Sequence, residues 1–372
     1  IVYAYNGNGQ LDRMDLPGAG SISVTAREWL APSEIVFPGG SRLTISHNAF
    51  SETTEVRATS PTQATLLSQS YQYGVMGELT QRSIAEQSTS YTYDNALHLT
   101  EADKAGFGGD RAFTLDAAAN RTSDSNTSGT WQYDDANRLI QRGSISYAYD
   151  VDGNLISKTD SASSGALRVT HYLYDAYNRL VEVRDANDQA IARYTYDPFS
   201  YRLSKEVTAT AAQATGAVAG VTLFLQGSEG VLAEADQSGT VLRSYGWMVG
   251  EQYGKTPIFT RQAGSYYYYL NDVQGAPWRE IDQAGAVVWA ATDYTVDGQA
   301  TLASGSTIYQ PWRLPGQYAD GETGLHYNLH RYYDPQIGRY ISSDPIGLAG
   351  GINTYLYANA APTIYYDAYG LW

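Results

Sequence analysis

Residues 131–155 read "WQYDDANRLIQRGSISYAYDVDGNL", and one pattern occurs twice within this stretch. The pattern is aromatic-x-Tyr-Asp, followed by three residues, a polar residue and Leu. It recurs along the chain in strict and degraded copies, with the Asp or its equivalent at positions 74, 94, 116, 134, 150, 175 and 197. Successive positions lie 16 to 25 residues apart, which is the period of a small supersecondary unit that is repeated in an array.

Each copy predicts a β-hairpin. Alternating aromatic residues place their rings on one face of a strand, Asp with its Asn or Gly followers favours a turn of two to four residues, and Leu begins the return strand. A single hairpin cannot bury its own apolar face, so successive hairpins must stack into a long antiparallel sheet that curls or closes. We therefore expect an all-β fold of stacked hairpins forming a curled antiparallel sheet. Helical signals are weak, and "TAREWLA" at 25–31 is one short example.

The composition agrees with a β-rich protein and excludes several classes of function. Tyr occurs 33 times against 7 Phe and 7 Trp, and Tyr suits half-buried sheets. The net charge of -15 is spread along the chain and would repel a phosphate backbone, so we expect no nucleic-acid partner. The absence of Cys excludes disulfides and thiolate chemistry.

No apolar stretch is long enough to cross a bilayer. The nearest one, "GAVAGVTLFL" at 216–225, is too short and too rich in Gly, so we expect no membrane span. The sequence opens on "IVYAYNGNGQ", which lacks both an initiator Met and the features of a signal peptide. We expect the chain to be a fragment of a longer protein.

Two long strings follow the repeats. They are "YYYYLNDVQGAPWREIDQAGAVVWAATDYTVDG" at 266–298 and "WRLPGQYADGETGLHYNLHRYYDPQIGRYISSDPIGLAGGINTYLYANAAP" at 312–362. Together with the repeats they resemble the Rhs, or YD-repeat, family, which includes the C component of Tc toxins and the teneurins. The resemblance covers roughly residues 71–371 and implies a YD-repeat shell over 1–265 and an Rhs repeat-associated core over 266–372. Leu270 stands where the family usually has His, and Ala368 where it usually has Pro.

The resemblance also implies a function. Such repeats wind into a hollow, cocoon-like shell around a C-terminal polypeptide, usually a toxin, and two aspartates in paired D-P-x-G motifs cut the chain after the Leu of the second motif. The matching motifs here are "DPIGL", which begins at Asp344, and "DAYGL", which begins at Asp367, so the cleavage site would lie at Leu371 and Trp372. No cofactor is implied.

The resemblance further implies partners and a location. The partners are the toxin domain of the same chain, a missing N-terminal Rhs or plug region, and components of a secretion system such as type VI or of a Tc complex. The protein would then be a bacterial effector that is made in the cytoplasm and is secreted or injected.

The residue types alone support a single-turnover aspartic protease. Two close carboxyl groups in an apolar setting share one proton, which leaves one group as base and the other as acid. Asp344 and Asp367 would meet if the chain between them formed an out-and-back hairpin, with strands in "TYLYA" at 354–358 and "TIYY" at 363–366. We predict that Arg339, five residues before Asp344, pairs with one carboxylate and lowers its pKa.

Several other readings stay open. An isolated Asp-Pro-x-Gly is usually a plain turn, which is our prediction for Asp197 and Asp334. His326 and His330 have the spacing of metal ligands on a helix, but their context alternates like a strand, so we expect no metal site.

The main alternative function is a non-catalytic YD-repeat binding or adhesion module that recognises a glycan or a protein. Exposed aromatics such as "YYYYL" at 266–270 would serve such a module, although packing in the core is the simpler role for these residues. A free, multiple-turnover hydrolase has the least support.

Overall fold

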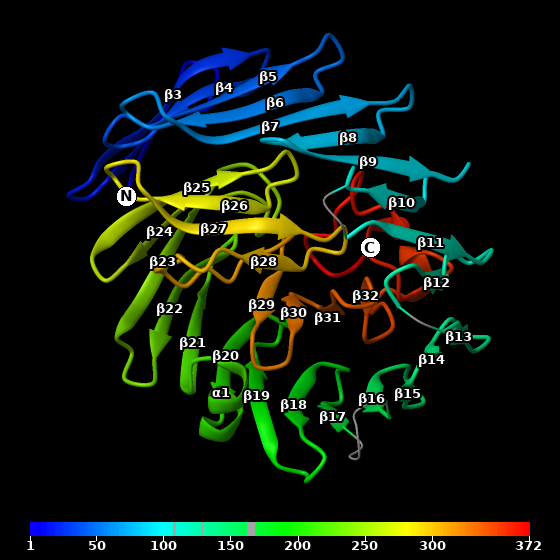
Figure 1. Ribbon diagram of the computed structural model, residues 1–372. Coiled ribbons are helices and arrows are strands. Elements are labelled where there is room, and N and C mark those ends of the chain that lie inside the picture. The colour runs from blue at the N-terminus through cyan, green and yellow to red at the C-terminus, as the bar shows by residue number, and fades with distance from the viewer. Residues whose placement is uncertain (107–108, 128, 162–167) are drawn as a thin grey trace.

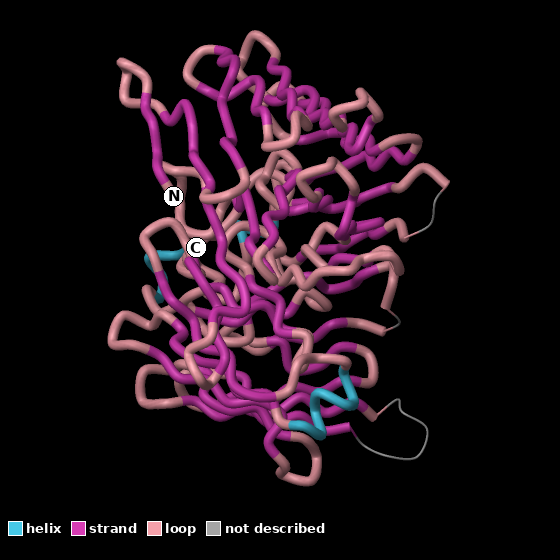
Figure 2. Tube along the Cα trace, turned by 90° about the vertical axis from the view of Figure 1, so that its left-hand side faces the viewer, coloured by secondary structure: helices cyan, strands magenta, loops and turns pink. Residues whose placement is uncertain are grey.

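The strands of this protein follow one another in space in the order in which they occur in the chain. The computed structural model describes residues 1–106, 109–127, 129–161 and 168–372, and these are mostly β-structure (Figure 1). In the described residues, three antiparallel sheets contain 12, 16 and 4 strands, and within each sheet every strand pairs only with its neighbours in the sequence. Figure 2 shows the strands stacked side by side with turns along both edges. The predicted all-β fold of stacked hairpins is confirmed.

The first sheet consists of β1 (Val2–Tyr5), β2 (Leu11–Leu16), β3 (Gly20–Glu28), β4 (Ala31–Val36), β5 (Arg42–His47), β6 (Thr53–Thr59), β7 (Thr65–Tyr73), β8 (Leu79–Ile84), β9 (Gln87–Tyr93), β10 (Leu99–Asp103), β11 (Arg111–Leu115) and β12 (Arg121–Asp124). The second consists of β13 (Trp131–Tyr133), β14 (Leu139–Arg142), β15 (Ile145–Tyr149), β16 (Leu155–Asp160), β17 (Arg168–Tyr174), β18 (Leu180–Arg184), β19 (Ala190–Tyr196), β20 (Arg202–Val207), β21 (Gly220–Gln226), β22 (Val231–Asp236), β23 (Val241–Trp247), β24 (Pro257–Gln262), β25 (Ser265–Asn271), β26 (Pro277–Ile281), β27 (Val287–Tyr294) and β28 (Ala300–Leu302). The third consists of β29 (Tyr318–Asp320), β30 (Leu325–Asn328), β31 (Arg331–Asp334) and β32 (Arg339–Tyr340).

The repeated Asp organises the turn of each hairpin. In the turn between β13 and β14, the N–H of Asp134 donates to the carbonyl of Arg138 (3.1 Å), and Oδ1 of Asp134 accepts the N–H groups of Ala136 and Arg138, both at 3.0 Å. Asn137 takes the left-handed conformation (φ 61°) that this turn requires, which Asn tolerates well. The carboxylate therefore accepts the main-chain N–H groups within the turn and stabilises it, which explains why Asp recurs at this position.

The inner face of the sheet is built from the first aromatic residue and the Leu of each repeat. Both kinds of side chain are buried: Tyr91, Trp131, Tyr147, Tyr172 and Tyr194 on one side of the turns, and Leu99, Leu139, Leu155 and Leu180 on the other. The second Tyr lies on the same face and reaches back toward the preceding hairpin, because its hydroxyl donates to a main-chain carbonyl there. The pairs are Tyr93 with Leu79 (2.5 Å), Tyr133 with Arg121 (2.9 Å) and Tyr196 with Leu180 (2.6 Å). These bonds link neighbouring repeats.

The C-terminal part of the chain lies on the inner side of the curled sheets, as the orange and red segments of Figure 1 show. It is anchored to both large sheets. Asn353 donates to the carbonyl of Ala118 beside the first sheet (2.9 Å), and the hydroxyl of Tyr355 donates to the carbonyl of Gly153 in the second (2.7 Å). The region that contains both Asp-x-x-Gly-Leu motifs is therefore held where the two sheets meet.

One local prediction was wrong, and the one weak helical signal that the sequence offered does not correspond to a helix. Residues 25–31 carry no helix, because they form the end of β3, a turn at Trp29 (φ 57°) and the start of β4. The segment between the two motifs is not a β-hairpin: left-handed residues at 358–360 break any strand, and short 3-10 turns at Gly347–Gly350 and Ala358–Ala360 replace it. One α-helix, α1 (Ala209–Thr215), was not predicted.

The predicted domain boundary at 265/266 falls at the start of β25, in the middle of the 16-stranded sheet. The division into 1–265 and 266–372 therefore does not coincide with a break between sheets, and it stays a prediction about sequence motifs. Among the described residues, no helix is long and apolar enough to cross a membrane.

Candidate functional site

Asp344 and Asp367, which are 23 residues apart in the sequence, meet at one arginine. Nη2 of Arg331, the first residue of β31, lies 2.9 Å from Oδ2 of Asp344 and 3.3 Å from Oδ2 of Asp367. All three side chains are buried. The same guanidinium donates from Nε to the carbonyl of Gly370 (2.6 Å) and from Nη1 to that of Thr354 (2.9 Å). One buried cation thus bridges both carboxylates and also holds the main chain at Thr354, between the two motifs, and at Gly370, within the second motif.

The second motif wraps around its own carboxylate. Oδ1 of Asp367 accepts three main-chain N–H groups, those of Tyr369 (3.2 Å), Gly370 (2.8 Å) and Leu371 (3.1 Å). Oδ2 accepts the N–H of Trp372 and the hydroxyl of Tyr340, both at 2.7 Å. The carboxylate of Asp367 is therefore fixed in direction, with Oδ2 against the nitrogen of the Leu371–Trp372 peptide.

The first motif places Asp344 near Gly350, which also lies close to the carbonyl of Leu371. A Cβ added to Gly350 would lie 2.6 Å from Oδ2 of Asp344 and 3.4 Å from the carbonyl oxygen of Leu371, so both oxygens face the same small space beside Gly350. Burial raises the pKa of Asp344, the nearby charge of Asp367 raises it further, and Arg331 and the N–H of Ile346 only partly offset this. Asp344 is thus suited to carry a proton next to the Leu371 carbonyl.

Both carboxyl groups thus lie near one peptide, the one that joins Leu371 to Trp372. The N–H of Trp372 bonds to Asp367, and the carbonyl oxygen of Leu371 lies near Gly350, as Oδ2 of Asp344 does. Hydrolysis of an amide by carboxyl groups needs a base for water and an acid for the carbonyl oxygen and the leaving nitrogen. Two carboxyl groups, one of them with a raised pKa, lie near the Leu371–Trp372 peptide, and groups of this kind are the ones that such a reaction uses.

A cavity of about 620 Å³ opens beside the pair. Asp344, Gly350 and Trp372 line this cavity together with His98 and the turn at 117–119 between β11 and β12. The cavity has room for many water molecules, so water can reach Asp344 and Trp372, which line it.

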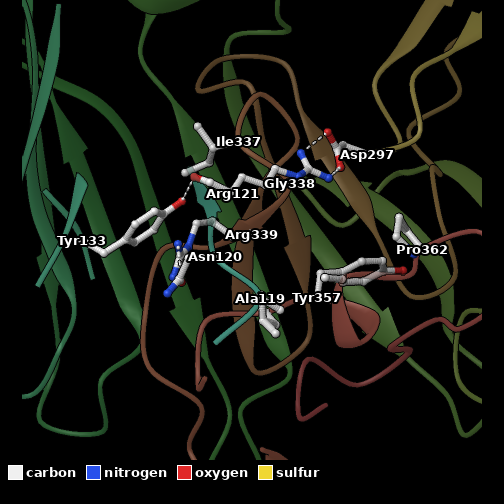
Figure 3. A pocket seen from close by; sticks show the side chains of 12 residues that line it. Ala119, Asn120, Arg121, Tyr133, Asp297, Ile337, Gly338, Arg339, Tyr357 and Pro362 are labelled. Atoms are coloured by element: carbon white, nitrogen blue, oxygen red, sulfur yellow. Dashed lines mark hydrogen bonds and ion pairs between the residues drawn. The ribbon is translucent and has the colours of Figure 1, made fainter. Parts of the chain in front are cut away.

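The prediction that Arg339 pairs with one of the two aspartates is wrong. Its guanidinium donates to the carbonyl of Asn137 (2.6 Å) and to Oδ1 of Asn120 (3.4 Å), and it stacks over the rings of Tyr133 and Tyr355. Figure 3 shows Arg339 beside Asn120 and Tyr133. Proximity in the sequence was misleading because Arg339 and Tyr340 are neighbours on a strand and so point to opposite faces.

The arginine at the pair, Arg331, was missed by sequence reasoning, although the sequence contains a signal for it. Tyr333 pairs with Tyr340 across the β31–β32 hairpin, so Arg331, two residues before Tyr333, lies on the face of Tyr340. Its guanidinium indeed stacks over the Tyr340 ring at 3.6 Å. Treating 331–340 as a hairpin would have selected Arg331 in place of Arg339.

The remaining candidates have structural roles. His326 is buried, its Nδ1 bonds to Gln317 (2.7 Å), and burial lowers its pKa to about 3. No group of three or more potential metal ligands occurs in the part of the chain that the structure describes. Asp197 and Asp334 cap turns through their carboxylates, as predicted. In the cluster at 266–270, Tyr268 and Tyr269 are buried core residues.

Comparisons with known proteins agree with this fold. Residues 42–213 match the Teneurin YD-shell family. Double-stranded DNA deaminase toxin A of Burkholderia cenocepacia (strain H111) is 31% identical over 321 residues, which cover 81% of this chain and 22% of the relative. Probable deoxyribonuclease RhsA of Dickeya dadantii (strain 3937) is 27% identical over 373 residues, which cover 91% of this chain and 25% of the relative. The chain thus spans about a quarter or less of these two relatives.

Solved structures show the same architecture. The crystal structure of TcdB2-TccC3-Cdc42 superposes with a TM-score of 0.65 at 17% identity, covering 99% of this chain and 20% of the matched chain, and that of TcdB2-TccC3 gives 0.64. At this level of identity the likeness concerns the fold. The repeats, the sheets that they build and these matches together show that the chain is a YD-repeat shell protein of the Rhs family.

Proposed function

We propose that this Rhs-type shell cuts its own chain once, between Leu371 and Trp372, with Asp344 and Asp367 as an aspartic-type acid–base pair. The observation that carries the proposal is the 2.7 Å contact between Oδ2 of Asp367 and the N–H of Trp372, with Asp344 beside the carbonyl of the same peptide. General acid–base catalysis requires carboxyl groups this close to the peptide that is cut. Two turns with a purely structural role would have no need of such proximity.

In the proposed reaction the pair shares one proton, which Asp344 carries. Water attacks the carbonyl carbon of Leu371 and gives a proton to Asp367, while the proton of Asp344 moves to the carbonyl oxygen. The C–N bond then breaks, and the nitrogen of Trp372 takes the proton from Asp367 as the carbonyl oxygen returns its proton to Asp344. The products are a carboxyl group on Leu371 and an amine on Trp372, and the pair regains its starting state. Arg331 holds both carboxyl groups in place throughout.

Release of a polypeptide is the purpose of such a cut. The matched relatives are several times longer than this chain, and the names of some of them describe toxins. We infer that the residues following Trp372 form a toxin enclosed by the shell, that further N-terminal Rhs or plug sequence completes the enclosure, and that the product is a secreted or injected effector carried by a type VI or similar system or within a Tc-like complex.

Intact mass measurement tests the cut. The chain is extended after Trp372 by a folded reporter protein, and wild type is compared with Asp344→Asn and Asp367→Asn. Wild type should yield a fragment that begins at Trp372, and both variants should stay whole. Asp197→Asn, which alters an Asp-Pro turn elsewhere in the shell, is the matched control and should cleave normally. An uncleaved wild type would exclude self-cleavage and favour the non-catalytic binding or adhesion module.

A further inference from the structure

Tyr340 occupies a fixed place between two other polar groups of the site. Its hydroxyl donates to Oδ2 of Asp367 (2.7 Å) and accepts a hydrogen bond from Nδ2 of Asn328 (2.7 Å). The same nitrogen donates to the main-chain carbonyl of Asp367 (2.8 Å). Since a carbonyl oxygen is an acceptor, the amide of Asn328 must present its nitrogen on this side. The hydroxyl of Tyr340 therefore has its proton directed at Asp367.

The position of Tyr340 matters because of what else binds Oδ2 of Asp367. That oxygen also accepts the N–H of Trp372, and Arg331 approaches it to 3.3 Å. Oδ1 is occupied by the main-chain N–H groups of its own turn. The Tyr340 hydroxyl is thus a neutral side-chain donor that binds Oδ2 and leaves Oδ1 to the main-chain N–H groups.

We propose that Tyr340 is a positioning residue for Asp367, and that its hydroxyl, oriented by Asn328, holds Oδ2 against the Trp372 amide during self-cleavage. The inference rests on the proposed self-cleavage and adds to it a residue that does not contact the reacting peptide. Burial and the neighbouring Asp367 raise the pKa of Tyr340 well above its ordinary value, so the hydroxyl keeps its proton at neutral pH.

The chain provides a closely matched control. Tyr333 pairs with Tyr340 across the β31–β32 hairpin, and their rings are 5.8 Å apart. Tyr333 is equally buried, yet its hydroxyl has no hydrogen-bond partner among the residues that the structure describes. Tyr340→Phe and Tyr333→Phe thus remove the same atom from adjacent places in one aromatic cluster, and the two variants differ in whether that atom touches Asp367.

The titratable and charged groups that face Asp367 are Arg331, His330, Tyr340, Tyr357 and Asp344. Tyr340→Phe leaves the other four in place. Since a hydroxyl donor stabilises the ionised carboxylate, its loss should move the acid limb of the cleavage-rate profile to higher pH. A residue with a merely structural role would reduce the folded fraction and leave the shape of the profile unchanged.

The experiment follows cleavage of the chain with a reporter after Trp372 during cell-free synthesis, from pH 5 to 8, with thermal unfolding as a check on folding. Tyr340→Phe should slow cleavage about ten- to a hundredfold, the range for loss of a hydrogen bond to a charged group, and Tyr333→Phe should cleave near the wild-type rate. Asn328→Asp, which replaces the orienting donor by an acceptor, should also slow it and serves if Tyr340→Phe fails to fold.

Equal rates in wild type and folded Tyr340→Phe, or equal losses in the two Phe variants, would overturn the inference while leaving self-cleavage intact. A wild type that behaves like Asp344→Asn would instead refute the proposed function itself, so the two failures are distinguishable.

Discussion

The main-chain nitrogen of Trp372 lies 2.7 Å from Oδ2 of Asp367. The carboxylate thus contacts the peptide that joins the motif to the next residue, five positions along the chain. A turn-capping Asp elsewhere in this protein bonds N–H groups two and four residues ahead, as Asp134 does, and stops there. The additional contact distinguishes the C-terminal motif from the repeated turns of the shell.

Removing the guanidinium of Arg331 should abolish cleavage and destabilise the protein. Arg331→Met leaves two buried carboxylates without their shared cation, a change that typically costs about 3–5 kcal/mol. Arg339→Met is the matched control: it loses hydrogen bonds to Asn137 and Asn120, which should cost about 1–3 kcal/mol, but folded molecules should still cleave. Urea unfolding and the cleaved fraction of folded protein measure the two effects. Cleavage that depends on Arg339 and not on Arg331 would contradict the assignment.

Gly350→Ala should slow cleavage because the added methyl group crowds the carboxyl of Asp344. The added methyl group would lie 2.6 Å from Oδ2 of Asp344 and 3.4 Å from the carbonyl oxygen of Leu371, so the Asp344 carboxyl must shift from its present position. A displacement of about 1 Å in a reacting group can reduce a rate on the order of a hundredfold. Gly305→Ala adds the same methyl group where no atom lies within 4 Å and should cleave normally. A normal rate in Gly350→Ala would show that Asp344 does not act at this distance.

Glu280 on β26 should make the protein less stable as pH rises. It is fully buried, and burial raises its pKa well above the ordinary value, which the hydroxyls of Tyr269 and Thr260 only partly offset. The folded state therefore binds more protons than the unfolded state above about pH 4.3, the ordinary pKa of Glu. Stability should fall from that pH upward, by about 1.4 kcal/mol for each pH step of one, until the pH reaches the raised pKa of the folded state.

The variant Glu280→Gln removes the titration and should flatten the pH dependence of the urea midpoint between pH 4 and 8, with the gain over wild type largest at pH 8. Glu101→Gln on an exposed part of β10 is the control and should follow wild type. Parallel curves for wild type and Glu280→Gln would rule out this role for Glu280.

The Asp of a single repeat should stabilise its hairpin measurably. Oδ1 of Asp175 accepts the N–H groups of Tyr177 (2.9 Å) and Arg179 (3.0 Å), and Oδ2 accepts Nε of Arg179 (2.8 Å). Asp175→Ala should lower the free energy of unfolding by about 1–3 kcal/mol. Asp175→Asn retains an oxygen in the position of Oδ1 and should lose less, as equilibrium unfolding in urea can establish. An equal loss in both variants would mean that the charge matters and the turn bonds do not.

The sequence predicts the shell well because its information is local. The repeat, its turn residues and its alternating aromatics are all contained within one hairpin, and each hairpin packs on the next one in the sequence. The C-terminal segment differs because its conformation depends on distant partners. Asn353 and Tyr355 bond to residues more than 200 positions earlier, and these contacts hold 341–372 in an irregular path that no strand periodicity reveals.

The same contrast explains the site. The two aspartates could be selected from their motifs, but their common partner could not be chosen by separation in the sequence. Arg331 reaches them because a hairpin turns at Asp334, and Arg339 points to the opposite face for the same reason.

The strictly sequential pairing of the strands also determines the order in which this molecule is assembled. A strand that pairs only with its chain neighbours can be added as soon as it leaves the ribosome, so the sheets can grow from β1 onward without waiting for later sequence. The segment 341–372 is made last of the described chain, and its anchors at Ala118 and Gly153 exist only when both sheets have formed. In the proposed reaction, cleavage is therefore a checkpoint: the bond is cut only in a molecule in which the hairpins that carry Ala118 and Gly153 have already formed.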